Sequence, residues 1–164
     1  MANPKLNIEK EGIDHFYNGL SWIGLIAMIA LPLYYYNQLP EKVPIHFNPK
    51  GDVDGWGASS TIWIISGVGV LLFLFLNFIE KIPHQFNYPV KITAENAQAQ
   101  YRIGLQLMRF MKAMVMLCFA YISYSIIRSA LSDDPGLSSW FLPVFLLVFF
   151  GGMGYYLRLA YQEK

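Results

Sequence analysis

Charged residues are almost absent from four long stretches of this chain. The stretches cover residues 15–40, 55–79, 113–131 and 135–157, and Arg128 is the one Asp, Glu, Lys or Arg within them. Each supplies the roughly 20 apolar residues that an α-helix needs to cross about 30 Å of hydrocarbon. Backbone groups in lipid must pair within their own segment, so each stretch is expected to be helical. The pattern predicts an all-α membrane protein, a single domain over 1–164, with helices at about 16–37, 59–80, 93–132 and 137–160.

The first stretch is expected to remain as a membrane anchor. Its apolar part, Leu20 to Tyr36, is longer than a typical signal-peptide core and carries no small-residue cleavage site. It ends in three consecutive tyrosines, which is typical of the aromatic belt at a membrane interface.

The third helix is predicted to begin well before its apolar part. Apolar residues recur at spacings of three and four from Thr93 onward; they are Ala94, Ala97, Tyr101, Leu105 and Met108. Thr93 is a suitable N-cap, and Gly104 is the one breaker before the apolar stretch. We expect one long helix whose membrane part is about 110–132 and whose first turns lie on the cytoplasmic side. Asp133, Asp134, Pro135 and Gly136 then predict a short turn.

Composition agrees with a membrane protein and excludes several other classes. The chain is 55% hydrophobic and 14% charged, with a formal net charge of +1. No clustered basic surface is evident, so nucleic acid is not an expected partner, whereas membrane lipids are. The single Cys118 excludes an intrachain disulfide and a cysteine-based zinc cage. No cofactor is expected, and the oligomeric state is left open.

Basic residues are distributed unevenly between the two sides of the predicted bundle. The side with both termini and the middle loop has nine, against three on the other: Lys5, Lys10, Lys81, Lys91, Arg102, Arg109, Lys112, Arg158 and Lys164, against Lys42, Lys50 and Arg128. Loops rich in Lys and Arg remain in the cytoplasm. We therefore expect both termini to be cytoplasmic and the loop at 39–60 to face outward.

The outward loop between the first two helices contains the residues best suited to a site. They are His46, Phe47, Asn48, Asp52, Asp54 and Trp56, set among several prolines and glycines. An ordered recognition loop would use the two aromatic residues as anchors and the polar groups for specificity. Alternatively, His46, Asp52 and Asp54 are candidate ligands for a divalent metal, or His46 is a general base oriented by an Asp. The structural alternative is that Asn48, Asp52 and Asp54 cap turns.

His46 is the most informative residue of this loop. Pro44 and Pro49 restrict the backbone on either side of it, and Gly51 allows the chain to reverse. We expect a compact loop in which the imidazole lies within hydrogen-bond or metal-ligand reach of Asp52 or Asp54.

The fourth predicted helix contains a cluster of glycines, Gly151, Gly152 and Gly154. Small residues allow two membrane helices to approach closely. We interpret the cluster as a helix-packing face, within the chain or against a larger assembly.

The outward loop also carries a family resemblance. Leu39-Pro-x-x-Val-Pro-x-His46-Phe47-Asn48-x-x-Gly51-x-x-Asp54-x-Trp56 resembles the signature of a bacterial membrane domain of unknown function that is found in SdpI-like immunity proteins. Segments 86–90 and 95–101 are similar to stand-alone members of that family. The resemblance implies a multi-pass protein of the bacterial cytoplasmic membrane and supplies no catalytic residues. SdpI-like proteins have further membrane helices beyond those predicted for this chain.

Three functions are compatible with these observations. The leading hypothesis is a recognition or immunity-type protein that binds a peptide, lipid or partner through residues 39–60, and is not an enzyme. The alternatives are a membrane-bound metal-dependent enzyme using His46 with Asp52 or Asp54, and a structural accessory subunit of a larger complex.

Overall fold

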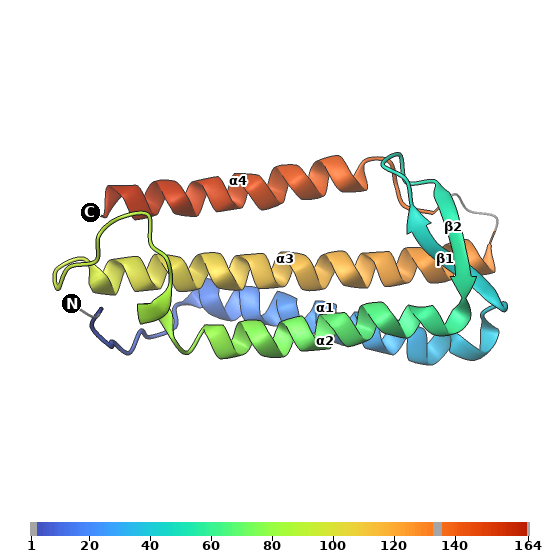
Figure 1. Cartoon of the computed structure of the whole chain (residues 1–164), viewed down its shortest axis with the longest axis horizontal. Coiled ribbons are helices and arrows are strands. Elements are labelled where there is room, and N and C mark those ends of the chain that lie inside the picture. The colour runs from blue at the N-terminus through green and yellow to red at the C-terminus, as the bar shows by residue number, and fades with distance from the viewer. Residues whose placement is uncertain (1–2, 133–135, 164) are drawn as a thin grey trace.

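The computed structural model describes residues 3–132 and 136–163, and it is built around four long helices (Figure 1). The helices are α1 (Gly12–Tyr35), α2 (Ile62–Ile79), α3 (Ala97–Leu131) and α4 (Phe141–Gln162). All four are long and apolar enough to cross a membrane, which confirms the predicted four-helix membrane fold. Most of the turn predicted at residues 133–136 lies outside the described residues.

The helices form a bundle in which α3 is central. α1 and α2 lie on one side of α3 and α4 lies on the other, and both chain ends lie at the same end of the bundle (Figure 1). We call this the termini end. Leu25, Met28 and Phe73 pack on Met116 of α3 in the core between α1, α2 and α3.

α1 and α3 make a very close contact at Gly24. A Cβ at this position would lie 2.6 Å from the Met116 carbonyl carbon, so only glycine allows the two backbones to approach this far. The glycine cluster in α4 behaves differently within the chain. A Cβ on Gly152 would lie 2.3 Å from the Phe110 ring, while Gly151 and Gly154 have open space. The α4 packing contact with α3 is therefore made at Gly152, and a packing role for the other two remains a prediction.

Two helix starts differ from the predicted positions. α1 begins at Gly12 because the backbone N–H of Glu11 donates to the Asp14 carboxylate at 2.8 Å, which caps the helix before its apolar part. α3 begins at Ala97, four residues after the predicted start, and Asn96 is at the cap position. Thr93 nevertheless caps the turn ahead of α3: its Oγ1 accepts from the Asn96 N–H at 3.3 Å, and its own N–H donates to Asn96 Oδ1 at 2.8 Å.

The segment between α2 and α3 folds back onto the first turns of α3. The Tyr88 hydroxyl donates to the Pro83 carbonyl at 2.8 Å, and its ring stacks on Tyr101. This burial raises the pKa of Tyr88 above its ordinary value, because the phenolate would lose hydration. A hydrogen bond from Thr93 lowers the pKa of the exposed Glu95 carboxyl.

The ordered segment between α1 and α2 is a β-hairpin, which the sequence pattern did not predict. Strands β1 (Lys42–Phe47) and β2 (Val53–Ala58) pair antiparallel, with irregular pairing around His46. The hairpin lies at the end of the bundle opposite the termini (Figure 1). We call this the hairpin end. Val43 of β1 is fully buried against Ile62, Ile126 and Ile127, which fixes the hairpin to α2 and α3.

Candidate functional site

His46 and Asp54 form a polar pair on the exposed surface of the hairpin. The His46 Nδ1 lies 2.5 Å from Asp54 Oδ1, and the two side chains are 70% and 44% exposed. This confirms the predicted contact between His46 and one of the two carboxylates. An ionised carboxylate only accepts hydrogen bonds, so Nδ1 donates, and Nε2 makes no hydrogen bond to any residue that the structure describes.

Asp52 lies in the turn of the hairpin and does not join this pair. Asn48 Nδ2 donates to Asp52 Oδ2 at 3.1 Å, and Asn48 Oδ1 accepts from the backbone N–H groups of Lys50 and Asp52. This is the turn-capping role considered as the structural alternative for Asn48 and Asp52. The hypothesis of a metal site made by His46, Asp52 and Asp54 is corrected, because these side chains do not converge. Over residues 3–132 and 136–163, no three His, Cys, Asp or Glu side chains form a group able to hold a metal ion.

The two aromatic residues of the candidate site, Phe47 and Trp56, differ in exposure. Trp56 pairs with Pro44 in the strand register and is 54% exposed. Ile45 is exposed to a similar degree, 51%. The Phe47 ring is half-buried and lies against Gly136, where a Cβ would approach it to 2.9 Å. Trp56 and Ile45 are thus available for contacts, whereas Phe47 helps to seat the hairpin.

The tip of the hairpin is fastened to the segment that leads into α4. The N–H of Leu137 donates to the Gly51 carbonyl at 3.0 Å, and Gly51 has a φ of +95°. A side chain at Gly51 would also collide with the Leu137 carbonyl oxygen, at 2.2 Å. The position therefore requires glycine for both its backbone conformation and this close approach.

Two apolar cavities flank β1 and continue into the grooves between helices. One, of about 590 Å³, lies between the hairpin and helices α2 and α3. The other, of about 380 Å³, lies between the hairpin, α3 and α4. His46 and Phe47 line both cavities. The hairpin thus combines an exposed polar pair with apolar space that descends along the membrane helices.

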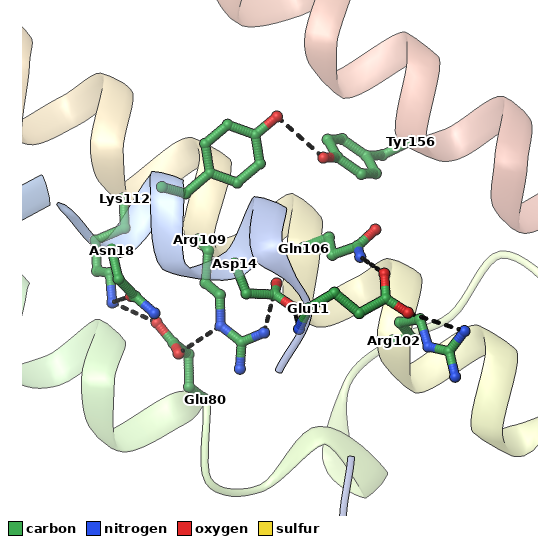
Figure 2. A network of polar contacts seen from close by, with 10 residues as sticks. Glu11, Asp14, Asn18, Glu80, Arg102, Gln106, Arg109, Lys112 and Tyr156 are labelled. Carbon is green, nitrogen blue, oxygen red and sulfur yellow. Dashed lines mark hydrogen bonds and ion pairs between the residues drawn. The ribbon is translucent and has the colours of Figure 1, made fainter. Parts of the chain in front are cut away.

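A second candidate site lies inside the bundle towards the termini end (Figure 2). Arg109 Nη1 forms an ion pair with Asp14 Oδ1 at 2.6 Å, Arg109 Nε donates to Glu80 at 3.0 Å, and Lys112 also binds Glu80. Lys112 Nζ further donates to the Oδ1 atoms of Asn18 and Asn77, both at 3.1 Å. We call Asp14, Glu80, Arg109 and Lys112 the ion quartet. Its four side chains are at most 9% exposed.

Further polar contacts lie beside the quartet, and one of them connects α1 to α4. Arg102 of α3 lies 3.1 Å from Glu11, and Gln106 donates to the same carboxylate at 3.1 Å. Tyr156 of α4 donates to the Tyr17 hydroxyl at 3.1 Å (Figure 2). The quartet has two positive and two negative charges, so it is neutral overall, and each ion has a partner. Paired charges of this kind hold helices in one register at a high cost if one partner is lost.

Sequence reasoning missed the ion quartet. The sequence pattern predicts Arg109 and Lys112 as charges on the cytoplasmic side of the chain, whereas the structure buries both side chains inside the bundle. A usable signal was present, because residues three apart share a helix face and the acids Asp14 and Glu80 bound the first two apolar stretches. What was not visible was which helix faces which.

Comparisons with known proteins cover the hairpin and much of the chain. Residues 23–70 match the model of a domain of unknown function (DUF1648). An uncharacterized protein of Archaeoglobus fulgidus is 25% identical over 159 residues, and the alignment covers 87% of each chain. No solved structure matches the chain. Residues 23–70, which match the family model, include both strands of the hairpin but none of the ion quartet. Fold and comparisons together define a multi-pass membrane protein, and residues 23–70 resemble a domain whose function is not known.

Proposed function

We propose that this protein is a recognition protein of the immunity type, which binds a membrane-active peptide through its hairpin end. The proposal includes kinship with the SdpI-like immunity proteins, whose signature the hairpin resembles. It places the protein in the bacterial cytoplasmic membrane with both termini inside and the hairpin outside. The uneven distribution of Lys and Arg supports this orientation.

The observation that carries the proposal is the position of the two apolar cavities on either side of β1. A membrane-active peptide is amphipathic, and it needs apolar space beside polar groups at the membrane surface. The cavities provide that space, and the exposed His46–Asp54 pair provides a polar contact at their edge. Trp56 and Ile45 add exposed apolar contacts.

The rigidity of the hairpin supports recognition rather than a simple connection. Isolated two-stranded hairpins are marginally stable in water. Here Val43 is buried in the bundle and Gly51 is bonded to Leu137, so both ends of the hairpin are fixed. A surface held in this way loses little entropy on binding.

Photo-crosslinking in native membranes tests the proposal. A photoreactive amino acid is placed at Ile45 or Trp56, and at Tyr34 as a control that is 72% exposed on α1. We expect peptide adducts from the two hairpin positions and only lipid adducts from position 34. Lipid adducts alone at all three positions would contradict a role in recognition.

An accessory role in a larger complex is the second candidate, and one observation favours it. Gly151 and Gly154 are both exposed on α4, and a Cβ on either would meet nothing within 4 Å. Small residues three apart on an open helix face suit a partner helix. Co-purification in mild detergent tests this role: a partner lost from Gly151→Leu/Gly154→Leu, but retained by Gly19→Leu on α1, would support it.

A further inference from the structure

A polar cavity of about 450 Å³ opens at the termini end, beside the ion quartet. Its walls are residues 6–8 and Lys10 of the segment before α1, the end of α2 with Lys81, and Leu105 and Arg109 of α3. The hairpin and its cavities lie at the opposite end of the bundle (Figure 1).

The segment before α1 crosses this region as a strap fixed at both ends. At one end Tyr101 donates to the Pro4 carbonyl at 2.9 Å, and Asn3 donates to the His84 carbonyl at 3.0 Å. At the other end Glu11 is paired with Arg102. Between these points, residues 5–10 make no hydrogen bond to any other part of the described chain. The strap is thus positioned, while its backbone N–H groups and the Lys10 ammonium are left as donors.

The charges around the cavity leave a positive excess. Arg109 and Glu80 belong to the neutral ion quartet, so they add no net charge. Lys10 and Lys81 are exposed and form no ion pair with any described residue. Two ammonium groups without an ion-pair partner among the described residues, both lining the cavity, attract an anion.

The position of the two lysines indicates which anion. Lys10 comes two residues before the first residue of the α1 span, Gly12, and Lys81 comes two residues after the last residue of the α2 span, Ile79. Both therefore lie where the membrane-crossing segments end, at the level of lipid headgroups. Leu6, Ile8 and Leu105 line the same cavity and supply apolar contacts.

We propose that this cavity binds the phosphate headgroup of an anionic membrane lipid, held by Lys10 and Lys81. The strap N–H groups add hydrogen bonds, and the apolar wall contacts the glycerol and upper acyl carbons. This inference is independent of the function proposed for the hairpin, because it uses residues at the other end of the bundle.

Native mass spectrometry of the full-length protein tests the site. The protein is released from nanodiscs that contain equal amounts of phosphatidylglycerol and phosphatidylcholine, and the lipids that remain bound are counted. The test variant is Lys10→Gln/Lys81→Gln. The control Lys42→Gln/Lys50→Gln removes two exposed lysines, and hence the same charge, from the hairpin. A parallel series adds inorganic phosphate at millimolar concentration.

We expect the wild type and the control to retain phosphatidylglycerol in preference to phosphatidylcholine. The test variant should lose this preference by about thirtyfold, since each of the two surface lysines contributes roughly 1 kcal/mol to anionic lipid binding. Equal retention by the test variant and the control would overturn the site. A second outcome would also overturn the proposal: the wild type retains the two lipids equally, and added inorganic phosphate displaces all bound lipid. The site would then bind free phosphate.

Discussion

The Arg109 guanidinium lies 2.6 Å from the Asp14 carboxylate, and the two side chains are only 5% and 1% exposed. The same guanidinium reaches Glu80, so a residue of α3 connects the first turn of α1 to the end of α2. Charge pairs between helices at this depth determine which helices are neighbours and in which register.

Substitution Arg109→Met should therefore destabilise the protein strongly. It leaves Asp14 charged and buried without its partner, a change that costs about 3–5 kcal/mol. The free energy of unfolding is measured by denaturant titration in detergent, followed by far-ultraviolet circular dichroism. Arg109→Lys keeps the charge but cannot bridge two carboxylates, so it should recover part of the loss. Lys91→Met, at an exposed position, is the control; a similar small effect for Arg109→Met would show that the quartet does not stabilise the bundle.

The close contact of α1 with α3 predicts that Gly24→Ala is harmful. The added Cβ would lie within 2.8 Å of the backbone of Met116 and Leu117, which cannot move aside as a side chain can. We expect a loss of about 1–3 kcal/mol, typical of overpacking. Gly19→Ala, on the same helix with open space around it, should be neutral or slightly stabilising. Equal stability of the two variants in the same denaturant titration would show that α1 and α3 are farther apart at Gly24 than in the structure.

The attachment of the hairpin tip predicts a local effect for Gly51→Ala. The substitution places a side chain at a φ of +95° and against the Leu137 carbonyl, so the tip should detach while the helices remain folded. Hydrogen–deuterium exchange should become faster by at least tenfold in peptides covering 44–56 and stay unchanged in α3. Gly67→Ala in α2, where an added Cβ meets nothing, is the matched control. Unchanged exchange in 44–56 would mean that the hairpin is held by other contacts.

The proposed orientation makes a simple labelling prediction. Single cysteines replace Lys50 and Glu95, both exposed, in a Cys118→Ala background, and whole cells are treated with a membrane-impermeant maleimide. Glu95 is chosen because its neighbour Asn96 is buried. Position 50 should react in intact cells, and position 95 only after lysis. The opposite pattern would reverse the orientation.

The four helices were predictable because their signal is local and strong. Stretches without charge define a membrane helix from composition alone, whatever the rest of the chain does. The errors were at the ends: α1 starts at Gly12 because Asp14 caps it, and α3 starts at Ala97 rather than Thr93. Capping depends on a few side chain to backbone bonds, so several start positions are similar in the sequence.

The hairpin was not predictable as a pair of strands. Pro44 lies inside β1, and prolines and glycines normally indicate turns. The strands form because Val43 is buried against α2 and α3 and because Gly51 is bonded to Leu137, contacts with residues far along the chain. The His46–Asp54 contact was predictable because it is local, but the choice of Asp54 over Asp52 depended on the strand register.

The position of the ion quartet along α3 determines how thick a membrane this protein fits. The helical rise places Lys112 about 28 Å from the end of α3 at Leu131, close to the roughly 30 Å hydrocarbon layer of a typical bilayer. A polar layer that connects three helices cannot slide into lipid one residue at a time. The bundle therefore has a nearly fixed hydrophobic length. In a bilayer made of shorter or longer acyl chains, either the bilayer changes its thickness around the protein or the helices tilt.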